Sequence, residues 1–166
     1  MMFADSISLA PALKPRPRCA GLGSPTGFAA ETRMRTIIGL RAVADLRPGD
    51  LLLDTYGQII ALLGIRERNT SAANLVRIDP SAFGLGVRMG CVHRRLTVGA
   101  GQRLGVRDWR TDILFGGPGL TQASRLIDGL HVHHETADTA LYQLEFAEDV
   151  ILDANGFAAQ VRRSDA

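Results

Sequence analysis

Apolar residues fall along the chain in short runs, and Gly, Pro, Asn and Asp separate these runs at short intervals. Short apolar runs bounded by turn-forming residues are typical of strands in sandwich or barrel-like folds. We therefore predict strands at Leu51–Leu53, Gln58–Ile65, Asn74–Ile78, Arg95–Val98, Thr111–Phe115, Leu141–Phe146 and Val150–Leu152. The pattern of a helical turn occurs only at Gln122–Ile127. Together these positions predict an all-β fold.

Residue types at two places in the sequence predict turns. Asp54–Gly57 lies between two of the apolar runs, as the turn of a β-hairpin would. Asp50 follows a Pro-Gly pair, and a carboxylate in such a position commonly accepts a hydrogen bond from a nearby backbone N–H. We expect Asp50 to stabilise this turn rather than to act as a base.

The first 26 residues differ in composition from the rest of the chain. They contain four of its seven prolines, a spacing that is incompatible with a long helix or a central strand. We predict an extended N-terminal arm over residues 1–26. Residues 1–13 have neither the basic start nor the apolar core of a secretory signal peptide. A cytoplasmic location is therefore the default expectation, and the true compartment stays open.

Charge is nearly balanced, with 19 Lys and Arg against 17 Asp and Glu and a net charge of +2. No run of basic residues is longer than two, whereas nucleic-acid binders usually concentrate positive charge on one face. We expect no nucleic-acid partner. The longest apolar stretch, Ile59–Ile65, is much shorter than the ~20 residues of a membrane-spanning helix, so we expect no membrane partner either.

Cysteine and histidine provide one candidate for a metal site. Cys91 and His93, like His131 and His133, are two residues apart, so each pair would share one face of a strand. A zinc site with these four ligands is geometrically conceivable. Nothing in the sequence brings the two pairs together, and the common metal, phosphate and hydrolase motifs are missing. We predict no cofactor.

A family resemblance begins at Gly27. Residues 27–50 read GFAAETRMRTIIGLRAVADLRPGD, which resembles the opening of a Hint domain, the self-processing module of hedgehog proteins and inteins. Later segments resemble further parts of bacterial Hint domains in the family's order: Val76–Ile78 with Phe83–Gly86, Arg94–Trp109, Ala123–Gly129 and Ala154–Gly156. The resemblance covers about 130 of the 166 residues. It implies a horseshoe of short antiparallel strands over residues 27–158, between the arm and a C-terminal tail of residues 159–166.

The resemblance also implies a chemistry, and this chain departs from it. In Hint domains the first residue, usually Cys, attacks the preceding peptide carbonyl, and a His in a T/S-x-x-H motif protonates the leaving amine. Here the first position is Gly27, and Gly99 and Gln102 replace the hydroxyl residue and the histidine of that motif. Gln143 stands where the bacterial family often has another His. We expect these four residues to be vestigial positions that line the remaining cleft.

We therefore predict a Hint-fold protein that has lost self-splicing and autocleavage and acts as a binding or structural module. We expect its N-terminal arm to contact a protein partner, as a small subunit of a larger bacterial or phage-like assembly would. Two alternatives stay open. One is autoprocessing with Thr26, Ser24 or Cys19 as a substitute nucleophile, and the other is a zinc-binding protein or zinc hydrolase.

Overall fold

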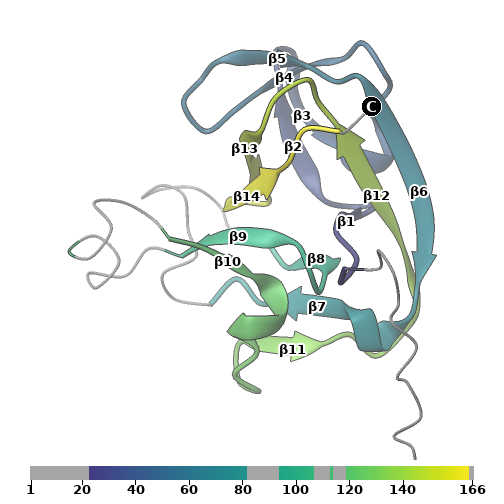
Figure 1. The fold of residues 1–166 in the computed structure, drawn as a ribbon, viewed down its shortest axis with the longest axis vertical. Helices are drawn as coiled ribbons and strands as arrows, with labels where there is room; N and C mark the ends of the chain where they lie inside the picture. Colours follow the sequence, from purple (N-terminus) through teal and green to yellow (C-terminus); the bar gives the residue numbers. More distant parts are fainter. Residues whose placement is uncertain (1–22, 82–93, 107–112, 114–118, 165–166) are drawn as a thin grey trace, which may run out of the picture.

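Two curled antiparallel sheets build the domain (Figure 1). The computed structural model describes residues 23–81, 94–106, 113 and 119–164. The strands are β1 (Phe28–Ala29), β2 (Arg33–Thr36), β3 (Gly39–Ala42), β4 (Leu51–Leu53), β5 (Ile59–Ala61), β6 (Gly64–Thr70), β7 (Leu75–Ile78), β8 (Leu96–Gly99), β9 (Arg103–Val106), β10 (Gly119–Gln122), β11 (Val132–His134), β12 (Thr139–Glu145), β13 (Val150–Ala154) and β14 (Phe157–Val161). Short 3-10 helices, η1 (Val43–Asp45), η2 (Ala72–Asn74) and η3 (Ala123–Leu126), lie between them. The described part of the chain contains no helix long and apolar enough to span a membrane.

The strand order places early and late segments of the described chain side by side. The first sheet has the order β11-β7-β8-β1-β12-β6, and the second has the order β10-β9-β14-β13-β2-β4-β5, with β3 paired to β2. β6 and β12 pair along their whole length and form the long outer wall in Figure 1. β1 has only two residues, yet it lies between β8 and β12 inside the first sheet. The prediction of an all-β fold of antiparallel strands is confirmed.

One apolar core joins the two sheets. Its members include Phe28 on β1, Met34 on β2 and Phe157 on β14, each at most 1% exposed. Burial alternates along β13 and β14, as expected for strands with one face on the core. Burying one large apolar side chain contributes about 1.5–3 kcal/mol, so this cluster is the main source of stability.

Both predicted turns are present. The Asp54 carboxylate accepts the backbone N–H groups of Tyr56 and Gln58, each at 2.8 Å, and these bonds close the hairpin between β4 and β5. The Asp50 carboxylate accepts the backbone N–H of Arg47 at 2.8 Å. Both carboxylates therefore hold turns.

The run Gln58–Ile65 is not one strand, contrary to the prediction. It contributes β5, then bends, and β6 begins only at Gly64. Between the two strands, Leu62 is 1% exposed, and its backbone exchanges hydrogen bonds with Gly49 and Asp50. The chain bends because Leu62 enters the core and pairs with the turn before β4.

Several strands were not predicted, namely β1, β2, β3, β9, β10, β11 and β14. β1 has only two residues, and the others mix glycine, polar or charged residues with the apolar ones, so they lack the apolar runs that marked the predicted strands. β14 continues to Val161, so residues 159–161, which were expected in the tail, are paired with β13. The predicted helical turn at Gln122–Ile127 is present as η3. The predicted strand Thr111–Phe115 lies, apart from Ile113, outside the described residues.

Asp128 holds the turn before β11. Its carboxylate oxygen accepts the backbone N–H groups of Leu130, His131 and Val132 at 2.7–2.9 Å. These donors favour the ionised form, and they lower the pKa of Asp128 to about 2. The segment Ala123–Gly129, part of the family resemblance, thus preserves a turn.

Asn155 connects three segments that are far apart in the sequence. It lies in the turn between β13 and β14 with a φ of 51°, and Gly156 follows with a φ of 92°, the backbone that favours Asn-Gly in tight hairpins. Its Oδ1 atom accepts the Arg33 N–H at 2.7 Å, and its Nδ2 atom donates to the Arg95 carbonyl at 2.9 Å. Asn155 is 7% exposed, and both bonds are partly buried.

We expect Asn155→Ala to lower the free energy of unfolding by about 2–4 kcal/mol, because it leaves two partly buried backbone groups unpaired and places Ala at a positive φ. Urea unfolding followed by circular dichroism measures this loss. Asn155→Asp keeps the acceptor and the turn preference and should lose less. Equal stability of the Ala variant and the wild type would show that the side chain does not connect the segments.

Candidate functional site

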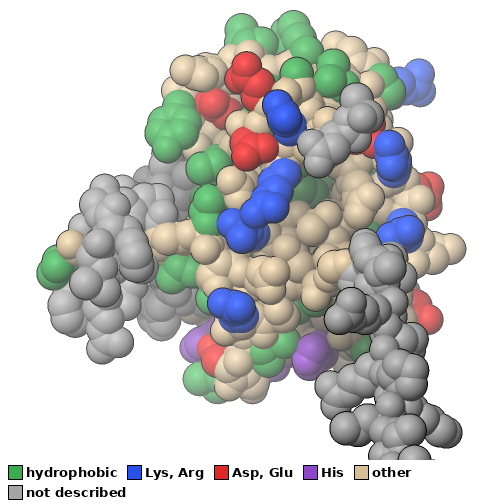
Figure 2. All heavy atoms as spheres, viewed as in Figure 1, with side chains coloured by type: hydrophobic (Ala, Val, Ile, Leu, Met, Phe, Trp, Pro, Cys, Tyr) green, Lys and Arg blue, Asp and Glu red, His purple; other side chains and the backbone are tan. Residues whose placement is uncertain are grey.

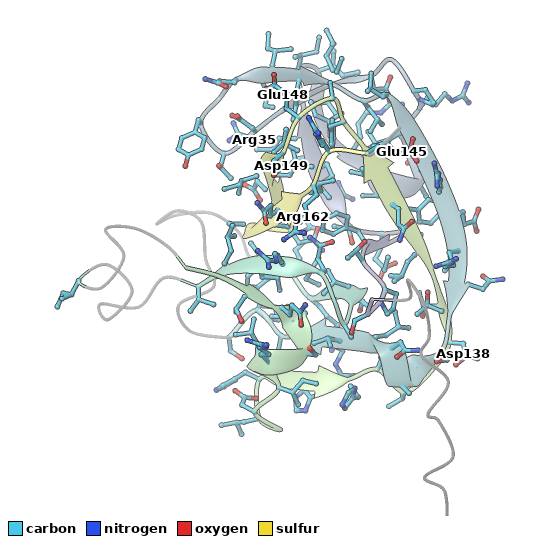
Figure 3. The ribbon with its side chains drawn as sticks, in the orientation of Figure 1. Arg35, Asp138, Glu145, Glu148, Asp149 and Arg162 are labelled. Carbon is cyan, nitrogen blue, oxygen red and sulfur yellow. The ribbon has the colours of Figure 1, made fainter. Side chains whose placement is uncertain are left out.

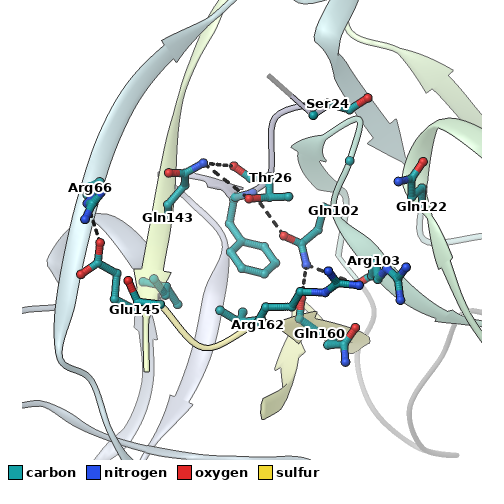
Figure 4. A pocket seen from close by; sticks show the side chains of 17 residues that line it. Ser24, Thr26, Arg66, Gln102, Arg103, Gln122, Gln143, Glu145, Gln160 and Arg162 are labelled. Carbon is teal, nitrogen blue, oxygen red and sulfur yellow. Dashed lines mark hydrogen bonds and ion pairs between the residues drawn. The ribbon is translucent and has the colours of Figure 1, made fainter. Parts of the chain in front are cut away.

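The chain enters the fold beside the turn that joins β8 and β9 (Figure 4). The Gly99 N–H donates to the Gly27 carbonyl at 3.1 Å, and the Gly101 N–H donates to the Pro25 carbonyl at 2.9 Å. Residues 25–27 therefore pair with this turn directly before β1 begins.

Two glycines allow the chain to approach this closely. A Cβ atom on Gly99 would lie 2.2 Å from the Pro25 oxygen, and one on Gly101 would lie 2.2 Å from the Ser24 oxygen. Both obstructing atoms belong to the backbone, so no side-chain rotation could relieve either contact. Positions 99 and 101 thus decide whether the entering segment fits.

Amide side chains hold the peptide between Thr26 and Gly27 at both of its polar groups (Figure 4). The Gly27 N–H donates to Gln102 Oε1 at 3.1 Å. On the other side, Gln143 Nε2 donates to the Thr26 carbonyl at 3.2 Å and to the Thr26 hydroxyl at 3.4 Å. The peptide is clamped between β12 and the β8–β9 turn.

Buried hydrogen bonds fix the orientation of the Gln102 amide. The residue is 3% exposed, and its Nε2 atom donates to the Gln160 carbonyl at 2.7 Å and to the Arg103 carbonyl at 3.2 Å. Because the nitrogen must face these two carbonyls, the oxygen faces Gly27. The same side chain therefore ties β9 and β14 to the entering segment.

A pocket of about 400 Å³ opens beside the clamped peptide, within the size range of small-molecule sites. Gly27, Gln102 and Gln143 line it, whereas Gly99 does not and packs against Pro25 instead. The charged side chains of its wall are Arg66, Arg103, Glu145 and Arg162.

The sequence model of the Hint domain family matches residues 26–161 of this chain. This span begins at the clamped peptide and ends with β14. This chain belongs to the Hint domain family. No curated protein sequence matches it.

Solved structures of inteins and an intein-like domain share the fold. The TvoVMA intein is 15% identical with a TM-score of 0.57, and the alignment covers 81% of this chain and 96% of that one. The gp41-1 intein is 12% identical with a TM-score of 0.56, covering 82% and 98%. A bacterial intein-like domain from Clostridium thermocellum is 16% identical with a TM-score of 0.55, covering 84% and 100%. At these identities the likeness concerns the fold alone.

Position 27, which the resemblance aligns with the first residue of Hint domains, does not accommodate a side chain. Gly27 has a φ of 124°, and a Cβ atom there would lie 2.8 Å from the Tyr142 carbonyl oxygen. An L-residue at position 27 would therefore be strained by its backbone and would collide with β12. The local structure has adapted to the glycine.

The described histidines lie elsewhere in the Hint fold. His131 Nδ1 is 3.0 Å from the Ser81 hydroxyl, and His133 Nε2 is 3.5 Å from the Asp79 carboxylate, at the β11 edge of the first sheet. Within the described residues, no three metal-ligating side chains come together. Cys19, Cys91 and His93 lie outside the described residues.

Sequence inspection missed three polar residues of the site, namely Arg103, Gln160 and Arg162. The pairing of β9 with β14 brings these residues together. Since the two strands are far apart in the sequence, no local motif marks the residues. The repeated glycines of Gly99-Ala100-Gly101 were the one available signal for the close backbone approach.

We expect Gly99→Ala to displace residues 25–27 and to lower the free energy of unfolding by about 1–3 kcal/mol. Amide hydrogen exchange at Gly101 should accelerate, since its acceptor on Pro25 moves away. Gly23→Ala is the matched control, because a Cβ atom there meets nothing within 4 Å. Unchanged exchange at Gly101 in Gly99→Ala would contradict the close packing of the segment.

Proposed function

We propose that this Hint domain no longer processes its own chain and keeps the peptide between Thr26 and Gly27 intact, as a binding or structural module. The observation that carries this proposal is the amide clamp on that peptide. Gln102 and Gln143 satisfy its N–H and its carbonyl, but an amide group transfers no proton near neutral pH. Gly27 supplies no nucleophile. The clamp therefore stabilises the uncleaved ground state.

The autoprocessing alternative with Thr26 as nucleophile finds less support. An attack by its hydroxyl on the preceding carbonyl would break the bond between Pro25 and Thr26, whose carbonyl oxygen accepts the Gly101 N–H at 2.9 Å. A donor is thus present, but the reaction also needs a base to remove the hydroxyl proton. The hydroxyl is held by the amide of Gln143, which is not a base. Ser24 and Cys19 as alternative nucleophiles, and the zinc hypothesis, stay predictions.

We expect the intact mass of the purified chain to stay unchanged during a day at neutral pH, with and without dithiothreitol. Mass spectrometry of the whole protein measures this, and Thr26→Ala is measured in parallel. Loss of an N-terminal fragment from the wild type would overturn the proposal. If Thr26→Ala then stayed intact, cleavage would depend on the Thr26 hydroxyl.

The second sheet carries an exposed apolar surface that supports a role in assembly. Leu51 and Leu53 point away from the buried Leu52, and they pair with Ala61 and Ile59 on β5. Antiparallel sheets normally present polar residues on such an outer face. We define this apolar face as Ile37, Leu40, Leu51, Leu53 and Ile59, of which Leu40 and Ile59 are at least 60% exposed. Figure 2 shows hydrophobic side chains gathered over this end of the domain.

We propose a second copy of the chain as the occupant of the apolar face. Arg35 stands opposite Leu40 in the strand register, and Figure 3 shows Glu148 and Asp149 at the same end of the domain. A surface with both signs of charge around apolar residues can match itself across a two-fold axis. The N-terminal arm stays a second predicted contact with a partner, and its residues 1–22 lie outside the described part.

We expect light scattering after size exclusion, at about 0.1 mM chain, to give twice the chain mass for the wild type and the single mass for Ile59→Glu. The buried carboxylate would oppose association at the apolar face. Leu130→Glu is the matched control, because Leu130 is 70% exposed but lies outside that face. A wild-type monomer at this concentration would overturn the proposed dimer.

A further inference from the structure

Strand register places a row of polar side chains along one wall of the pocket. Gln122 of β10 pairs with Arg103 of β9, and Arg103 pairs in turn with Gln160 of β14. Directly paired residues project to the same face of a sheet. Arg162 directly follows the end of β14 at Val161, and it also lines the pocket. All four residues line the pocket.

The charge of this wall is not balanced. Arg66 is paired with Glu145 on the opposite wall, whereas the structure shows no acidic partner for Arg103 or Arg162 among the described residues. Their side chains extend toward the same region of the pocket (Figure 4). Two neighbouring guanidinium groups repel each other unless an anion lies between them.

A second observation in the same row also indicates a ligand. The Oε1 atom of Gln160 is buried and has no hydrogen-bond partner. A buried acceptor without a donor costs free energy, and this oxygen belongs to a residue of the pocket wall. The wall therefore offers two strong donors to an anion. Gln160 Oε1, which solvent does not reach in this structure, becomes an acceptor for an N–H or O–H group when its amide turns toward the pocket.

We propose that the pocket binds an oxyanion, a carboxylate or a phosphate group of a small polar molecule, between Arg103 and Arg162. An N–H or O–H group of the same molecule donates to Gln160 Oε1. Guanidinium groups suit both oxyanions because they donate paired N–H bonds in one plane. A volume of about 400 Å³ admits a small molecule.

The test is a titration of the isotopically labelled full chain, followed by amide NMR shifts, with inorganic phosphate in one arm and acetate in the other. Binding in the millimolar range is expected for at least one anion, with shifts at the pocket residues. Arg162→Gln and Arg103→Gln should each weaken binding by about tenfold or more, because each removes a charge-assisted donor. Arg162 is exposed, so its replacement leaves the fold intact even if the β9 variant is unstable.

Arg47→Gln is the charge-matched control, because Arg47 is exposed and lies outside the pocket lining. Its affinity should equal that of the wild type. Glycolate should bind more tightly than acetate, since its hydroxyl can donate to Gln160, and Gln160→Leu should remove this difference. Equal affinity in the wild type and Arg162→Gln, or no shifts with either anion up to about 50 mM, would overturn the proposal. The intact-mass experiment separately decides the question of cleavage.

Discussion

The close passage of residues 24–27 over the glycine turn between β8 and β9 positions everything else in the cleft. Two backbone hydrogen bonds hold the segment there, and both need the absence of a Cβ atom at positions 99 and 101. The passage brings the Gly27 N–H to Gln102, whose other hydrogen bonds reach β9 and β14. Space that a hydroxyl side chain at position 99 would need is thus occupied by the incoming backbone. The absence of a side chain at position 99 and the close packing of the segment are two aspects of one arrangement.

Local features of this fold were predictable from the sequence, and long-range features were not. The turns at Asp50 and Asp54 depend on hydrogen bonds between residues two to four positions apart, so the residue types at those positions predicted them. The resemblance identified Gly27, Gln102 and Gln143 as positions of one site, and their contacts follow from the fold. The row formed by Arg103 and Gln160 depends on the pairing of two strands far apart in the sequence. No local pattern specifies that register.

The Leu51–Leu53 run shows that a correct strand prediction does not tell which faces of the strand are buried. An unbroken apolar run is typical of a strand covered on both faces. In this domain only Leu52 faces the core, whereas Leu51 is exposed and Leu53 is half-buried. The apolar residues on the outer side of this strand are therefore not explained by the packing of a single domain. The interpretation as an assembly surface arises from that mismatch between sequence and exposure.

The hydrogen bond between Asn155 and Arg33 also affects how the protein folds during its synthesis. Arg33 and Asn155 are 122 residues apart, and the neighbouring β1 strand likewise pairs with the late strand β12. A ribosome adds roughly 5–20 residues per second, so Arg33 waits about 6–24 s for its partner to be synthesised. During this interval β2 can already pair with β3 and β4, but β1 lacks β12, and the apolar side chains of these early strands are available to chaperones or to aggregation. Folding of this domain is therefore completed only after nearly the whole chain has left the exit tunnel.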